Sequence, residues 1–139
     1  MTTYLLDANV LVALLVPEHE HHDPARAWLV SCPDEAVFVL SPITEGAYCR
    51  YMVRCGYSIK TSQAALNHLH LLEQWAFWPD DASYADIDMN DVHGHKQVTD
   101  TYLAELAHSH GGLLVTCDRP LAQRRQSTTM LIPGVIPGA

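Results

Sequence analysis

The sequence predicts an α/β fold built on a small, mainly parallel sheet of about four or five strands. Short apolar runs, typical of buried strands, alternate along the chain with longer segments whose apolar residues recur at helical spacing. Proline, glycine and small polar residues separate these segments at positions that favour helix starts and stops. Strands that alternate with helices pair through right-handed crossovers, so we expect their carboxyl ends to meet along one edge of the sheet.

The first third of the chain is expected to hold one strand and two helices. Residues 4–6 form a short apolar strand. Asn9 can cap a deeply buried helix over residues 10–16, which are apolar on all sides. A second helix is expected to begin with Asp23 as its cap and Pro24 in its first position, where proline is well tolerated.

The middle of the chain repeats this arrangement. Residues 37–40 form the second strand, and Ser41 caps a helix that stops at Gly56. The next helix is expected to begin at Thr61 or Ser62, since apolar residues then follow at helical spacing.

The last third of the chain completes the sheet. A short strand over residues 76–78 precedes a polar, acidic loop over residues 80–95. A helix over residues 97–109 leads into residues 113–116, the clearest buried strand of the chain. Residues 130–132 are expected to form a last strand at the edge of the sheet.

The composition indicates one domain that spans residues 1–139. Hydrophobic residues make up 48% of the chain, enough for one core, and no apolar run approaches the roughly 18 residues of a membrane span. The N-terminus has no basic region of the kind that begins a signal peptide, so we expect a cytoplasmic protein. None of the four cysteines forms a Cys-x-x-Cys pair, and buried, unpaired thiols are expected.

The formal net charge of −8 counts against a nucleic-acid partner, because affinity for phosphate comes mainly from lysine and arginine. The basic residues are, however, unevenly spread, and local charge matters more than net charge. Five of the eight could line the rim of a site at the sheet edge, with ordinary solvated arginines as the alternative. They are Arg50, Arg54, Arg119, Arg124 and Arg125.

Four acidic residues are placed where the predicted elements would bring them to that edge. Asp7 and Asp118 each follow a strand, while Glu45 and Asp100 lie in the first turns of helices. Carboxylates gathered in this way repel one another, and a hard divalent cation such as Mg²⁺ or Mn²⁺ would remove the repulsion. The pattern therefore favours metal-assisted phosphoryl chemistry.

Four short segments resemble, in order, the acidic motifs of PIN-domain ribonucleases. They are LDANVL at residues 6–11, SPITE at 41–45, QVTDTYL at 97–103 and LVTCDR at 114–119. Each motif is weak by itself, but the ordered set covers nearly the whole chain and is specific. Within the family, the chain is most similar to VapC-type toxins of bacterial toxin–antitoxin modules, which are single small PIN domains.

This resemblance implies a PIN-like α/β/α sandwich and a set of functional residues. Asn9 and Thr116 would be the polar residues that support the acids, and Arg50, Arg54 and Arg119 are our candidates for binding substrate. The catalytic acids, which would also hold Mg²⁺ or Mn²⁺, would be Asp7, Glu45, Asp100 and Asp118.

The resemblance also implies a reaction and partners. The reaction would be endonucleolytic hydrolysis of structured RNA, either transfer or ribosomal RNA. A cognate antitoxin would insert a basic segment at the acidic pocket, and the toxin would form a homodimer.

The nine histidines suggest a zinc site, but their spacing does not favour one. Residues two apart on a helix face different directions, so neither His68 with His70 nor His108 with His110 can clamp a metal ion. We expect these side chains to lie at the surface. His95 and Lys96, just before the helix that carries Asp100, are better candidates for contact with phosphate.

Two other functions compete with a nuclease. A haloacid-dehalogenase-type phosphatase also places an aspartate after its first strand, but its motif needs a second aspartate where Asn9 stands. A PIN-like interaction module without catalytic activity would use the acidic pocket only to bind a basic peptide. Loss of one or more acids would indicate such a module, and all four are present.

Overall fold

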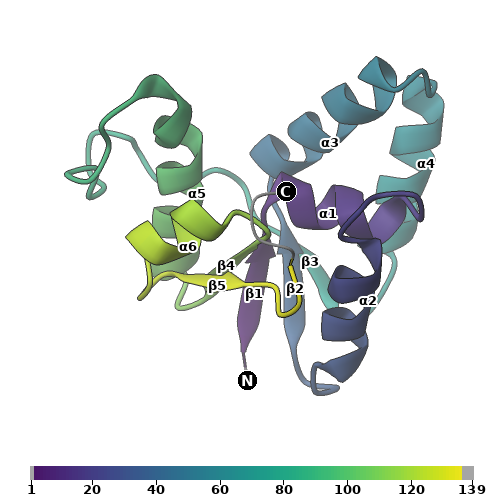
Figure 1. The fold of residues 1–139 in the computed structure, drawn as a ribbon, viewed down its shortest axis with the longest axis horizontal. Coiled ribbons are helices and arrows are strands. Elements are labelled where there is room, and N and C mark those ends of the chain that lie inside the picture. Colours follow the sequence, from purple (N-terminus) through teal and green to yellow (C-terminus); the bar gives the residue numbers. More distant parts are fainter. Residues whose placement is uncertain (1, 136–139) are drawn as a thin grey trace.

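Five parallel strands form one sheet among residues 2–135, the part of the chain that this computed structural model describes. Their order across the sheet is β3-β2-β1-β4-β5, so the first strand lies in the centre (Figure 1). The prediction of a small parallel sheet is therefore confirmed. The strands are β1 (Thr3–Leu6), β2 (Val37–Leu40), β3 (Trp75–Phe77), β4 (Leu113–Thr116) and β5 (Thr129–Leu131).

Helices cover both faces of this sheet and give an α/β/α sandwich, as predicted. Figure 1 shows α1 to α4 on one side of the strands and α5 with α6 on the other. No helix of the described residues is long and apolar enough to cross a membrane. The helices are α1 (Ala8–Leu15), α2 (His22–Ser31), α3 (Pro42–Arg54), α4 (Ile59–His70), α5 (Val98–Ser109) and α6 (Arg119–Arg124), with a 3₁₀ turn at His95–Gln97.

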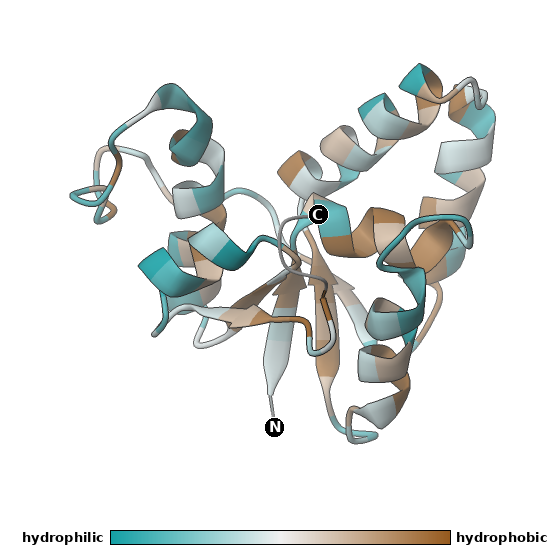
Figure 2. Ribbon diagram, viewed as in Figure 1, coloured by the Kyte–Doolittle hydropathy of each residue, from teal (hydrophilic) through white to brown (hydrophobic). Residues whose placement is uncertain are grey.

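The two faces of the sheet have separate hydrophobic cores because successive strand residues point to opposite sides. In β1, Leu6 packs into the core shared with α1 to α4, whereas Leu5 packs against α5 and α6. Their partners in β4, Val115 and Leu114, divide in the same way, and all four side chains are fully buried. Figure 2 shows this apolar band through the central strands.

Three helices begin earlier than the sequence predicts. Helix α1 starts at Ala8 and is capped by Asp7, not by Asn9, because the Asp7 carboxylate accepts from the Ala8 N–H at 2.8 Å. Helix α2 starts at His22, before the predicted cap. Ser58 caps α4, not Thr61 or Ser62, and its hydroxyl accepts from the Thr61 N–H at 3.2 Å.

Helix α6 was not expected from the sequence. Asp118 caps it by accepting from the Leu121 N–H at 3.1 Å, and Pro120 stands in its first turn. The sequence signal for the start of this helix was a capping residue followed closely by proline. Six residues with few apolar positions, however, give no helical periodicity to detect.

The cysteines agree only partly with expectation. All four are free, and Cys117 is buried, but Cys55 at the end of α3 is exposed. Burial and the nearby charge of Asp7 raise the pKa of the Cys117 thiol to about 12. Cys117 is therefore protonated at neutral pH and is not a nucleophile.

Candidate active site

Asp7 lies at the centre of the sheet edge, between the end of β1 and the start of α1. Only 7% of its surface is exposed, and both carboxylate oxygens are engaged. Oδ1 accepts from the Ala8 N–H at 2.8 Å, and Oδ2 accepts from the Thr116 hydroxyl at 2.8 Å. Burial, followed by the charge of Asp100 and more weakly that of Asp118, raises the Asp7 pKa to about 7.

Thr116 and Asn9 join the end of β4 to the start of α1. Besides donating to Asp7, the Thr116 hydroxyl accepts from the Asn9 side-chain amide at 3.3 Å and from the Asp118 N–H at 3.0 Å. The Asn9 oxygen accepts from the Cys117 N–H at 3.1 Å. The hydroxyl therefore links Asp7, Asn9 and Asp118, a geometry that suits a supporting role for both polar residues.

Asp100 approaches this centre from the opposite face of the sheet, in the first turn of α5. Burial and the charge of Asp118 raise its pKa, while the nearby guanidinium of Arg124 lowers it. Asp7, Asp100 and Asp118 thus interact electrostatically, although more than ninety residues separate the first from the second along the chain. The structure brings these three predicted acids to one place.

Glu45, the fourth predicted acid, contacts a histidine of α4. It stands in the first turn of α3, but its Oε2 is 2.5 Å from Nε2 of His70 at the end of α4. It is not among the charges that shift the pKa of Asp7 or Asp100. His70, which sequence analysis assigned to the surface, is the residue that our reasoning missed, because only the packing of α4 beside α3 reveals the contact.

The carboxylates of the aspartates are the ligand type that a hard divalent cation prefers, but their present arrangement does not form a metal site. Carboxylate oxygens are the preferred ligands of Mg²⁺ and Mn²⁺, and a bound cation would offset the repulsion that raises the pKa of Asp7 and Asp100. Within residues 2–135, however, no three His, Cys, Asp or Glu side chains are grouped closely enough to hold a metal ion.

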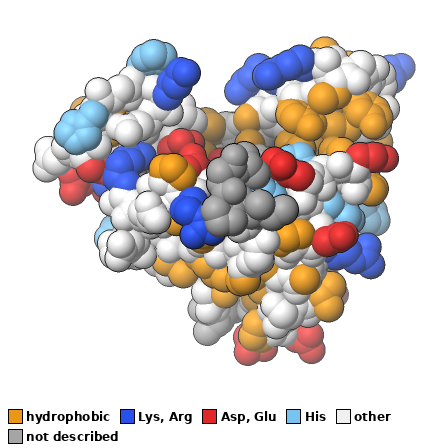
Figure 3. Space-filling model, viewed as in Figure 1, with side chains coloured by type: hydrophobic (Ala, Val, Ile, Leu, Met, Phe, Trp, Pro, Cys, Tyr) orange, Lys and Arg blue, Asp and Glu red, His pale blue; other side chains and the backbone are white. Residues whose placement is uncertain are grey.

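A notch separates the part of the molecule with α5 from the part with α3 and α4. Figure 3 shows acidic side chains low in this notch and basic side chains on both of its rims. On the α3 side, Arg50 and Arg54 are exposed, as a substrate-binding role requires. Arg119 is partly buried, and its Nη2 donates to the Val135 carbonyl at 3.3 Å.

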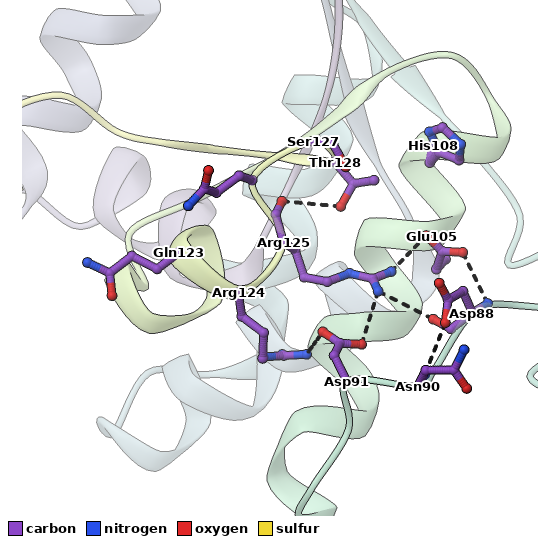
Figure 4. Close-up of a pocket in the computed structure, with 11 residues that line it drawn as sticks. Asp88, Asn90, Asp91, Glu105, His108, Gln123, Arg124, Arg125, Ser127 and Thr128 are labelled. Atoms are coloured by element: carbon purple, nitrogen blue, oxygen red, sulfur yellow. Dashed lines mark hydrogen bonds and ion pairs between the residues drawn. The ribbon is translucent and has the colours of Figure 1, made fainter.

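Arg124 and Arg125 do not form an open basic rim, contrary to our expectation. Arg125 donates to Asp91 at 3.0 Å and to Glu105 at 2.7 Å, and only 9% of its side chain is exposed. Arg124 pairs with Asp91 and donates to the Thr101 hydroxyl at 3.0 Å. These contacts lie beside a cavity of about 680 Å³ (Figure 4). Because both arginines are engaged in ion pairs with Asp91 and Glu105, we assign this cavity to structure.

Comparison with known proteins establishes the family. The family model described as PIN domain matches residues 4–126, most of the chain. The chain therefore belongs to the PIN domain family.

Its relatives place it among the VapC-type members of that family. It is 44% identical to Ribonuclease VapC29 of Mycobacterium tuberculosis (strain ATCC 25618 / H37Rv) over 131 residues, which cover 94% of this chain and 97% of the relative. The fold is similar to VapBC2 from Rickettsia felis, solved with a DNA fragment from its promoter (TM-score 0.66, 15% identity, 94% and 98% of the chains). It is also similar to FitAcB from Neisseria gonorrhoeae (TM-score 0.61, 25% identity, 91% and 96%).

Proposed function

We propose that this protein is a metal-dependent endoribonuclease, the toxin of a toxin–antitoxin module. Membership of the PIN domain family and 44% identity to a protein named as a ribonuclease support ribonuclease activity. The observation that carries the metal dependence is the set of three aspartates at the carboxyl ends of β1 and β4 and the start of α5. Burial and repulsion disfavour ionisation of Asp7 and Asp100, and bound cations would restore it.

The aspartates Asp7, Asp100 and Asp118 would hold the Mg²⁺ or Mn²⁺ ion. The cation would activate water and stabilise charge on the phosphate. Thr116 keeps the Asp7 carboxylate in a fixed orientation through the hydrogen bond to Oδ2. Asn9 holds Thr116 in turn, so the two polar residues preserve the geometry of the acidic centre.

Glu45 would act as the fourth acid, and His70 would orient its carboxylate. The 2.5 Å contact between its Oε2 and Nε2 of His70 fixes the direction of the carboxylate. His70 is itself in contact with the Phe77 ring, at a centroid distance of 5.5 Å. Glu45 is therefore oriented from the α4 side of the notch, while the aspartates are oriented from the sheet.

The substrate would be structured RNA, transfer or ribosomal. Figure 3 shows an open notch with basic side chains on its rims, and Arg50 and Arg54 of α3 are exposed and available to phosphates. Double-stranded regions of folded RNA are recognised largely by shape and by backbone contacts, which suits a small rim of positive charge.

The same acidic notch would receive the antitoxin. A basic segment of a cognate antitoxin would complement the net charge of −8 and the acids low in the notch. We also propose a homodimer, for which light scattering of the purified protein is the test.

Cleavage of total cellular RNA tests this function. The purified, antitoxin-free protein is incubated with RNA and Mg²⁺ or Mn²⁺, and new 5′ ends are mapped by sequencing. Asp100→Asn and EDTA should each abolish the cuts. Asp34→Asn is the matched control, because Asp34 is exposed in the loop before β2 and lies outside the site.

Discrete cuts that require both metal and Asp100 would support the nuclease and identify its target. Absence of cuts in the wild type, or cuts that persist in Asp100→Asn, would contradict the assignment. In that case the competing function, a PIN-like module that binds a basic peptide, would become the better account.

A further inference from the structure

A second cavity, of about 580 Å³, adjoins the acidic centre on the side of α6 and the loop before α2. It reaches the centre at Asn9 and Asp118, and its other walls include His19, His21 and Arg119. Its size falls in the range of small-molecule sites in proteins. The function proposed above uses Asn9 and Asp118 at its edge, but it gives no role to His19 or His21.

Two nitrogens at this cavity are buried without a partner. Within residues 2–135, neither Nε2 of His21 nor Nε of Arg119 has a hydrogen-bond partner, although both atoms are inaccessible to solvent. His21 is only 6% exposed. Buried polar atoms are nearly always paired in proteins, so two unpaired nitrogens on residues that line one cavity are available to a ligand. Because both atoms are sealed from solvent, the two side chains would turn slightly to meet it.

Hydrogen bonds near these nitrogens involve one side chain and one backbone group. The guanidinium of Arg119 is held by the bond from Nη2 to the Val135 carbonyl at 3.3 Å. The backbone N–H of His21 donates to Nδ1 of His19 at 3.1 Å. That bond makes Nδ1 of His19 an acceptor, which leaves its Nε2 as a further donor when the ring is neutral. Two acids, Glu20 and Asp118, also line the cavity.

We propose that this cavity is a subsite for the RNA nucleotide next to the scissile bond and that His21 and Arg119 bind its phosphate. The proposal rests on the proposed nuclease function. RNA that is cut at the aspartates extends beyond the scissile bond on both sides, and this cavity adjoins Asp118. Each nucleotide presents a phosphate that only accepts hydrogen bonds. A planar guanidinium suits such a group. Because phosphate contacts fix register, the subsite would position the strand for cleavage.

RNA binding by a cleavage-deficient protein tests the subsite. On an Asp100→Asn background with Mg²⁺, the affinity for a fluorescein-labelled, mixed-sequence RNA is measured by anisotropy. His21→Phe keeps a ring in place of the imidazole, and Arg119→Gln removes the guanidinium. Each should weaken binding about tenfold, the loss of roughly one charge-assisted hydrogen bond. The matched controls His68→Phe and Arg26→Gln alter exposed residues outside the cavity and should leave affinity unchanged.

Two further measurements distinguish a direct role of His21 and Arg119 in binding from a purely structural role. If both side chains hold the same phosphate, the double variant should lose clearly less than the product of the single losses. His21→Phe should leave the midpoint of thermal unfolding unchanged or higher, because it removes a buried orphan nitrogen. If the His21→Phe variant fails to fold, the test rests on the affinity of Arg119→Gln alone.

The outcomes also distinguish the subsite from the nuclease. If the wild type cleaves RNA but the folded variants bind RNA as tightly as the Asp100→Asn parent, the subsite is wrong and the nuclease stands. The cavity would then belong to a protein partner or to structure alone. If the wild type cuts no RNA and the parent binds none, both proposals fail together.

Discussion

Asp7 makes the stability of the protein depend on pH in an unusual direction. Burial and the neighbouring aspartates raise its pKa from 3.8 to about 7. The folded protein therefore binds this proton more tightly than the unfolded chain. The resulting stabilisation is full below about pH 4 and is lost as the pH rises through about 7.

We expect the free energy of unfolding in EDTA to fall between pH 4 and pH 7, by on the order of a few kcal/mol from Asp7. Asp100, whose pKa is also raised, contributes in the same direction. Asp7→Asn should flatten this part of the profile. Urea denaturation at several pH values measures it, and an equally steep fall in the variant would show that Asp7 is not responsible.

Thr116 is the most connected polar side chain of the site, and its hydroxyl is fully buried. Thr116→Val keeps the shape but leaves Asp7 Oδ2 without its donor. We expect a loss of about 1–3 kcal/mol in the free energy of unfolding and a fall in cleavage rate of about tenfold to a hundredfold. Thr116→Ser retains the hydroxyl and should restore most of the rate. Full activity of Thr116→Val would show that the Thr116 hydroxyl is not needed to support Asp7.

For single residues, the sequence identified the acids but not the side chains that each acid contacts. Asp7 and Asp118 follow buried strands, so their meeting could be predicted from the parallel sheet. The contact of His70 with Glu45 could not, since it depends on how two helices pack. The orphan nitrogens of His21 and Arg119 are likewise properties of the packed molecule.

Among the elements, strands were predicted more accurately than helix starts. The second and fourth strands occur over residues 37–40 and 113–116, as expected, because each is a short apolar run rich in β-branched or aromatic residues. The starts of α1 and α4 were misplaced because several neighbouring residues can all cap a helix. Only the backbone geometry decides among them.

The start of β4 requires a residue without a side chain. A Cβ at Gly112 would lie 2.7 Å from the backbone oxygen of Thr3, which cannot move without disturbing β1. We expect Gly112→Ala to lower the free energy of unfolding by about 1–3 kcal/mol. Gly94→Ala is the matched control, since nothing lies within 4 Å of its Cβ and φ is −151°. Equal stabilities of the two variants in urea denaturation would contradict this close approach.

Across the whole molecule, Arg125 attaches the acidic segment before α5 to the rest of the fold. It bridges Asp91 in that segment and Glu105 in α5, as Figure 4 shows. Arg125→Met would leave both carboxylates without this partner and should lower the free energy of unfolding by at most about 3 kcal/mol.

The Arg125→Met variant should also release the segment before α5. Limited proteolysis at 25 °C should then cut within residues 80–95 faster than in the wild type. Lys60→Met, at an exposed position of α4, is the control. Unchanged cutting would show that the ion pairs do not hold the segment.

The notch combines acids low between its walls with basic side chains on its rims, and this arrangement underlies the central claim (Figure 3). The most direct test is the single-turnover cleavage rate of a mapped RNA as a function of Mn²⁺ concentration. We predict that the rate rises to saturation with Mn²⁺, is absent in EDTA and falls at least about a hundredfold in Asp7→Asn and in Asp100→Asn. Cleavage that continues in EDTA, or that survives both substitutions, would contradict the account.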